Sequence, residues 1–285
     1  YPSGDNCQPF RFKVQKDHLE IHFNPEAAKH EFDYYKMATC VSLGCLLKAI
    51  EIAAAHFGFS TVEKPEKLVN RSQIWYTVFF SPSDGTAKNK DLFEQLDQRC
   101  TSRGTFLSAP RPNLLINHLK NQNQVYILEK YTDDFIENFQ KIDALYWLNT
   151  SAVRDLFKAV HFSQKRYHQV RTGIFWKELG IRYFEVPCSF LIKKIPLVTK
   201  IFYYPFFQFI FNGILKRNIL SSSFLVCVTS NCEVAKNTED FLNDQVNIGK
   251  QMMEIWLKCT KEGLLSQPLS IVPFLGSLLY FSHDI

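Results

Sequence analysis

The first ten residues carry a dense set of groups suited to binding a flat polar ring. Pro2 fixes its own φ angle and Gly4 permits a close backbone approach, while Ser3, Asn6 and Gln8 offer hydrogen-bond donors and acceptors. Such groups can read the edge of a planar heteroaromatic molecule. The same composition also fits an ordinary turn before a strand, so the interpretation needs support from elsewhere in the chain.

A second segment offers the groups that bind a phosphate. Arg99 and Arg103 lie four residues apart, with Thr101 and Ser102 between them. Guanidinium groups give forked donors to a dianion, and hydroxyls donate at shorter range. An isolated pair of this kind is also typical of solvated surface arginines. The sequence therefore predicts a phosphate site here only in combination with the opening loop.

Together the two segments resemble the FMN-dependent nitroreductase family. In that family an Arg-x-Ser-x-Arg/Lys segment holds the ribityl phosphate, and a Pro-Ser-x-x-Asn-x-Gln-Pro-Trp segment lines the isoalloxazine ring. This chain has Thr101 in place of the Ser and Phe10 in place of the Trp. Residues 263–271 are similar to a third motif, Gly-Leu-x-x-x-Pro-hydrophobic-Glu-Gly, whose backbone N–H approaches flavin N5. Ser270 and Ile271 replace its Glu and Gly, which bears on substrate access more than on flavin binding.

The resemblance implies an FMN-binding oxidoreductase that uses NAD(P)H to reduce a small oxidised acceptor, such as a nitro compound or a quinone, by ping-pong hydride transfer through flavin N5. It implies these site residues: Arg99, Thr101, Ser102 and Arg103 at the phosphate; Pro2, Ser3, Gly4, Asn6 and Gln8 at the ring; Asn218 at the pyrimidine edge; Pro268, Leu269, Ser270 and Ile271 at N5. The protein would supply orientation and hydrogen bonds, and the cofactor would supply the redox chemistry.

An internal repeat suggests two related halves. A shift of 205 positions places residues 43–59 on residues 248–264, with Gly44 on Gly249 and Gly58 on Gly263. Both segments show helical periodicity, end in a glycine suited to a C-cap and follow a strand candidate. Any two amphipathic helices that end in Gly can also be aligned in this way, so chance similarity is the alternative.

Members of the resembled family are usually homodimers with the flavin at the subunit interface, which implies that this chain is a single-chain pseudo-dimer. We expect an α+β, nitroreductase-like fold with mixed or antiparallel sheets flanked by helices. Its predicted parts are a first half at residues 1–80, a linker at 81–90, and a second half at 91–285 with a hydrophobic insertion or lid at 183–220. Some single-chain members are attached to adenylyltransferase domains of the ubiquitin-activating type, so such a domain, in cis or in trans, is an expected partner.

Periodicity and turn residues predict the individual elements. Strands are expected at residues 10–14, 19–23, 73–80, 124–128 and 224–229, and helices at residues 43–59, 91–98, 111–121, 132–148, 151–162 and 248–264.

The composition narrows the class of protein. With 285 residues and 46% hydrophobic content, the chain has ample material for a core. The net charge of +5 is modest and its basic residues are interleaved with acids, which argues against nucleic-acid binding. Eight scattered cysteines without a CxxC pair indicate a reducing, cytoplasmic location. The apolar stretch at 201–215 is shorter than the roughly twenty residues that span a bilayer, so we expect no transmembrane span there. An interfacial segment or an apolar lid is the expectation.

Side chains for acid–base or metal chemistry are not apparent in the sequence. His18 and His22 are expected to face solvent on a hairpin, and His161 and His168 to flank a solvated basic helix end. Two other classes of function remain open. One is a flavin-binding protein without turnover, and the other is a degenerate scaffold or interaction module that kept the fold and lost the cofactor. The first residues also suggest that the sequence is part of a longer polypeptide.

Overall fold

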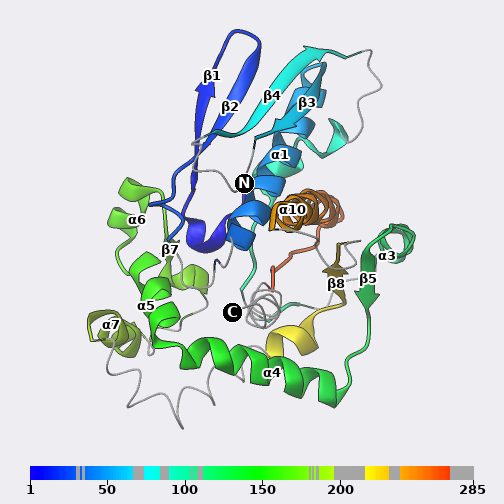
Figure 1. Ribbon diagram of the computed structural model, residues 1–285. Coiled ribbons are helices and arrows are strands. Elements are labelled where there is room, and N and C mark those ends of the chain that lie inside the picture. Colours follow the sequence, from blue (N-terminus) through cyan, green and yellow to red (C-terminus); the bar gives the residue numbers. More distant parts are fainter. Residues whose placement is uncertain are drawn as a thin grey trace.

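The structure is a computed structural model of the 285-residue chain. It describes residues 1–29, 33, 36–66, 74–83, 90–103, 105–107, 112–179, 181, 183, 186–195, 216–230 and 238–269. Helices and antiparallel sheets occur together (Figure 1), so the predicted α+β class is confirmed.

The first half of the chain builds a four-stranded antiparallel sheet. Its strands are β1 (Phe10–Val14), β2 (His18–Phe23), β3 (Phe59–Pro65) and β4 (Ile74–Pro82), in the order β1-β2-β4-β3. β4 is rich in aromatic and β-branched residues, which pack well on a pleated surface. It continues through the first two residues of the predicted linker at 81–90, so that part is strand and not linker.

Two long helices form the centre of the molecule. Helix α1 (Met37–His56) packs on the sheet through Leu43 and Leu47, and helix α10 (Thr238–Lys261) joins the same core through Val246. α1 is long and apolar enough to cross a membrane, but 61% of its most apolar window is buried inside the protein. As the buried helix of a core, α1 is weak evidence for a membrane span.

The two helices cross at the pair of glycines that the internal repeat aligns. A Cβ at Gly44 would lie 1.9 Å from the carbonyl oxygen of Val246, and a Cβ at Gly249 would lie 2.1 Å from the carbonyl oxygen of Val41. Val41 and Val246 are themselves 205 positions apart, so the contact is reciprocal, as in an interface with two-fold symmetry. Only glycine allows the two backbones to approach this closely.

A second strand pair repeats the first one. Strand β5 (Val125–Leu128) pairs antiparallel with β8 (Leu225–Val228), and α3 (Asn113–Lys120) precedes it. The 205-residue shift places β8 on the second half of β2, and both strands pair with the strand before them. Residues 15–17 connect β1 to β2, whereas residues 129–224 separate β5 from β8. The insertion is therefore wider than the predicted 183–220.

The insertion begins with α4 (Asp133–Leu148) and continues into what we call the α5–α7 lobe, residues 150–195. In α5 the Asn149 side chain accepts hydrogen bonds from the first backbone N–H groups, which is typical of an N-cap. The lobe has its own small core around Phe157 and Trp176. Its elements are α5 (Thr150–Ala159), β6 (Val160–His161), α6 (Gln164–Val170), β7 (Ile174–Phe175), η4 (Trp176–Leu179) and α7 (Val186–Lys194). Residues 216–221 form a further helical turn before β8.

Most predicted elements are confirmed, with shifted ends. The helix predicted at 151–162 ends at Ala159, and β6 follows it. α10 begins ten residues before its predicted start, because its polar first turns carry Glu239 and Asp240, which favour a helix N-terminus. The predicted helix at 91–98 is two short turns, η3 (Lys90–Leu92) and α2 (Gln95–Gln98). A 3-10 turn, η1 (Gly4–Asn6), lies in the opening loop.

Candidate functional site

A large cavity lies where the two halves and the insertion meet. It encloses about 2140 Å³, and its walls come from the opening loop, α1, residues 101–107, α4, the α5–α7 lobe, β8, α10 and the loop that follows α10. Ligand pockets usually measure roughly 300 to 1,000 Å³. The cavity is therefore large enough for more than one small molecule.

The opening loop contributes Pro2, Ser3 and Gly4 to the cavity wall. The Ser3 hydroxyl accepts a hydrogen bond from the Gln8 backbone N–H at 3.2 Å, which closes the loop on itself. A Cβ built on Gly4 would meet nothing within 4 Å. The protein itself does not need a glycine there, so the space above it is open to a ligand.

Asn6 and Gln8, which the resemblance places at the ring, are not among the described residues that line the cavity. The Asn6 amide donates to the carbonyl oxygen of Gly173 at 3.1 Å, and the Gly173 N–H donates back to the Asn6 carbonyl at 3.2 Å. The Gln8 amide donates to the Asn6 side chain at 2.7 Å. These hydrogen bonds hold the loop against the α5–α7 lobe, and the predicted contact of the two side chains with a flavin ring stays a prediction.

Thr101, Ser102 and Arg103 line the same cavity as the opening loop. The Ser102 N–H donates to the carbonyl oxygen of Ser266 at 3.0 Å, and Thr101 forms a parallel β-bridge with Ser266. Two of the three predicted motifs are thus directly joined. The Arg103 guanidinium donates to the carbonyl oxygen of Glu178 at 3.2 Å, which holds this cation at the edge of the cavity beside η4.

Arg99 packs against an aromatic side chain of α10. Its guanidinium lies 4.4 Å from the ring centroid of Trp256, a cation–π contact, and Arg99 is not among the described residues that line the cavity. Burial lowers the pKa of Arg99 from its ordinary value. Trp256 does line the cavity, so Arg99 packs against a residue of the cavity wall, and its predicted contact with a phosphate stays a prediction.

The loop after α10 lines the cavity next to residues 101–102. Gly263 has a φ of +73°, which ends the helix in the left-handed conformation as predicted. Pro268 and Leu269 line the cavity. Ser270 and Ile271, predicted to present a backbone N–H near flavin N5, lie outside the described residues.

Asn218 is the predicted residue from the insertion that reaches the cavity. Its side chain is 7% exposed, and its amide donates to the side chain of Gln267 at 3.3 Å. Gln267 lines the cavity as well. A pair of amides in the cavity wall can present both donors and acceptors to a heteroaromatic edge.

Sequence reasoning missed three polar residues in the cavity wall. Burial raises the pKa of the Asp33 carboxyl, which accepts a hydrogen bond from the Thr39 N–H at 3.2 Å. His161 was expected at a solvated helix end, but it lies in β6, and its Nε2 is 2.9 Å from the carbonyl oxygen of Thr172. The indole Nε1 of Trp256 is buried without a hydrogen-bond partner. Spacing gave no signal for these residues, because tertiary contacts bring them together.

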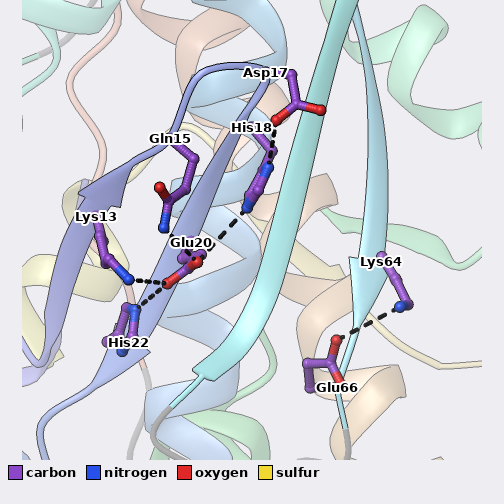
Figure 2. A network of polar contacts seen from close by, with 8 residues as sticks. All are labelled: Lys13, Gln15, Asp17, His18, Glu20, His22, Lys64 and Glu66. Atoms are coloured by element: carbon purple, nitrogen blue, oxygen red, sulfur yellow. Dashed lines mark hydrogen bonds and ion pairs between the residues drawn. The ribbon is translucent and has the colours of Figure 1, made fainter.

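The other predicted histidines lie on the sheet. Figure 2 shows His18 and His22 on either side of Glu20, with Nε2 atoms at 3.6 and 2.8 Å from its carboxylate oxygens. Their side chains are each 24% exposed and lie on the face of β2 opposite the buried Ile21, so they are on the outer side of the sheet, as expected. Within the described residues, no group of three His, Cys, Asp or Glu side chains is placed to hold a metal ion.

No protein-family model matches this chain, and no curated protein sequence is similar to it. The chemistry of the cavity is therefore inferred from its own residues and geometry.

Proposed function

We propose that this chain is an FMN-binding oxidoreductase with a nitroreductase-like fold, which uses NAD(P)H to reduce a small oxidised acceptor. One observation carries the proposal. Three segments that are far apart in the sequence, the opening loop, residues 101–103 and the loop after α10, line one cavity. These three segments are the ones that resemble the nitroreductase motifs.

The residues present fit a flat anionic cofactor. The hydroxyls of Ser3, Thr101 and Ser102 and the guanidinium of Arg103 give the cavity a side that can bind a phosphate. The open space above Gly4 leaves room for a polar aromatic group. When bound, FMN supplies storage for two electrons, and the protein supplies position and hydrogen bonds.

The size of the cavity favours turnover over storage. A pocket that only stores a cofactor encloses it closely, whereas this cavity exceeds the usual range for one ligand about two-fold. Phe135 and Phe139 of α4 and Leu225 of β8 line a further apolar part of it. We assign this part to the nicotinamide and acceptor molecules, which would occupy it in turn. An adenylyltransferase-type partner and a cytoplasmic location stay predictions from the sequence.

The test is flavin binding by the purified chain. We expect FMN to co-purify or to bind on titration, measured by absorbance and by quenching of flavin fluorescence. Arg103→Ala should weaken FMN binding by about 10- to 150-fold, because a charge-assisted hydrogen bond contributes roughly 1.5 to 3 kcal/mol. Arg166→Ala, an exposed arginine outside the cavity wall, is the matched control. A folded chain that does not bind FMN refutes the proposal. The scaffold or interaction module would then be the remaining candidate function.

A second variant separates the site from the fold. Gly4→Val should leave the thermal stability unchanged, because a Cβ at Gly4 meets no protein atom within 4 Å, and it should still weaken FMN binding. Oxidation of NADH and NADPH with a quinone or nitroaromatic acceptor then distinguishes an enzyme from a storage protein. Tight FMN binding with no oxidation of either nicotinamide would identify a flavin-binding protein without turnover.

A further inference from the structure

The positive charge of this chain is concentrated in one region. Residues 156–217 contain eleven Lys and Arg and two Glu, a net charge of +9, whereas the whole chain carries +5. The expectation that basic and acidic residues are interleaved throughout is therefore wrong for this region. The structure places most of its described basic residues on the surface of the α5–α7 lobe, which lies at the edge of the molecule away from α1 (Figure 1).

Cations of the lobe outnumber the acids that the structure describes there. The Lys193 ammonium donates to the carbonyl oxygen of Val160, and burial and then the charges of Arg166 and Lys194 lower its pKa. The acids of the lobe that the structure describes are already engaged. Asp155 is 2.7 Å from Lys158, and Glu178 accepts hydrogen bonds from the Tyr167 hydroxyl and the Phe175 N–H. Mutual repulsion of this kind is relieved by an anionic partner.

One side of α7 is apolar and exposed. Ser189 and Ile192 face the lobe core, whereas Phe190, Leu191 and Ile195 are 48%, 40% and 48% exposed. Leu191 and Ile195, the residue after α7, are four positions apart, and Phe190 is next to Leu191. We call these three exposed residues the apolar strip of α7. The strip and the cations occur together, because the Lys194 ammonium lies 5.7 Å from the centroid of the Phe190 ring.

The neighbouring turn repeats this combination. The Lys177 ammonium lies 5.2 Å from the ring of Tyr183, which is 73% exposed, and 5.6 Å from the ring of Trp176. Long cationic side chains over aromatic rings are typical of the boundary between water and lipid, where the apolar stem is buried and the charge stays hydrated.

The sequence that follows α7 continues this composition. From residue 195 to residue 215 Lys200 is the one charged residue, and the run lies between Lys193-Lys194 and Lys216-Arg217. Such a composition favours lipid over nucleic acid, which would be read by polar and charged groups.

We propose that the exposed strip of α7, together with Lys177, Arg166 and Lys194, binds the surface of an anionic phospholipid bilayer. The cations attract the headgroups, and the apolar strip enters the boundary between headgroups and acyl chains. This proposal does not depend on the flavin site. The chain would then be a peripheral membrane protein whose lobe determines the orientation of the cavity on the membrane.

The test is sedimentation of the full chain with vesicles. We expect binding to phosphatidylcholine vesicles that contain about a third phosphatidylserine, little binding to phosphatidylcholine alone, and release as salt rises from about 0.1 to 0.5 M. Lys177→Glu with Lys194→Glu should reduce the partition coefficient more than about 25-fold, because each basic residue contributes about five-fold. Lys64→Glu, an exposed lysine on β3 with 66% side-chain exposure, is the matched charge control.

The apolar strip is tested separately. Phe190→Ser with Leu191→Ser should lower binding several-fold, whereas Phe59→Ser with Val62→Ser, two apolar residues of β3 that are 43% and 63% exposed, should leave it unchanged. Circular dichroism establishes that each variant is folded. Equal binding to neutral and anionic vesicles, or native-like binding by the α7 variants, overturns the proposal. The native chain could also sediment in the absence of vesicles. If the Phe190 variant abolishes that sedimentation, the strip is a self-association surface, and the membrane proposal is overturned.

Discussion

The crossing of α1 and α10 gives the sharpest stability prediction. In Gly44→Ala the new Cβ would lie 1.9 Å from the carbonyl oxygen of Val246 and 2.8 Å from the Lys250 N. Both are backbone atoms of a helix, so a side-chain rotation cannot relieve the clash. The two helices must move apart by about 1 Å to restore an ordinary contact distance.

The cost follows from the core that surrounds the crossing. Leu43, Leu47 and Val246 pack together there, and their contacts weaken when the helices separate. Overpacking of this kind costs about 3 kcal/mol, and replacement of a helical glycine by alanine returns about 1 kcal/mol of helix propensity. We expect a net loss of about 2 kcal/mol in the free energy of unfolding, which lowers the melting temperature by about 5 °C.

The assay is urea unfolding followed by circular dichroism. Asn247→Ala on the exposed side of α10 is the control, because it adds helix propensity without a clash and should stabilise the protein by about 0.5 kcal/mol. Gly249→Ala should resemble Gly44→Ala, because its Cβ would lie 2.1 Å from the Val41 carbonyl oxygen. A Gly44→Ala variant as stable as the native chain would show that the helices do not cross at this distance.

Three further predictions concern single contacts. The pKa of Glu20 is lowered to about 2, first by the hydrogen bond from Gln15 and then by that from His22. The ionised carboxylate therefore stabilises the fold at pH values above the ordinary pKa of a glutamate, and this stabilisation is lost as the pH falls toward 2. Glu20→Gln should therefore lower the melting temperature near neutral pH and have no effect near pH 2. Burial raises the pKa of Cys45 to about 12 and that of Cys259 to about 11, so iodoacetamide at pH 8 should label Cys100 and Cys188 in the native protein and leave the two buried thiols unlabelled by mass spectrometry. Asn6→Ala removes the bond to Gly173 at a residue with φ of +51°, and should cost about 2 kcal/mol in urea unfolding; an unchanged midpoint would contradict the role of Asn6 in tying the loop to the lobe.

Local patterns predicted the elements that local physics controls. The strand at residues 10–14 and the helix α1 are confirmed as elements. Burial follows the two patterns less closely, because Phe10 is the one buried residue of β1 and α1 buries consecutive residues from Ser42 to Leu47. The repeat aligned Gly44 with Gly249, and the structure shows these residues in contact. In this chain, close packing of the two helices requires a glycine on each, and the repeat in the sequence revealed both glycines.

Contacts between residues far apart in the sequence could not be predicted from local patterns. Arg99 and Arg103 are similar in type and spacing, yet one stacks on Trp256 and the other bonds to Glu178, because partners more than 70 residues away decide their positions. Asn6 is a second example of a residue whose partner the sequence did not reveal. Its position in the sequence fits the motif, but the lobe supplies Gly173 as its partner. Long insertions change the environment of a motif without changing the motif itself.

The two halves differ at the point where a second cavity would be expected. After Gly58 the chain enters β3 and pairs with β4, whereas after the equivalent Gly263 it forms the loop that lines the cavity. The same helix end thus leads to a sheet edge in the first half and to a cavity wall in the second. We therefore expect one FMN per chain, measured as the end point of a titration against protein concentration. Binding of two equivalent FMN molecules would show that the sheet side of α1 also forms a site, and would contradict the single-cavity interpretation.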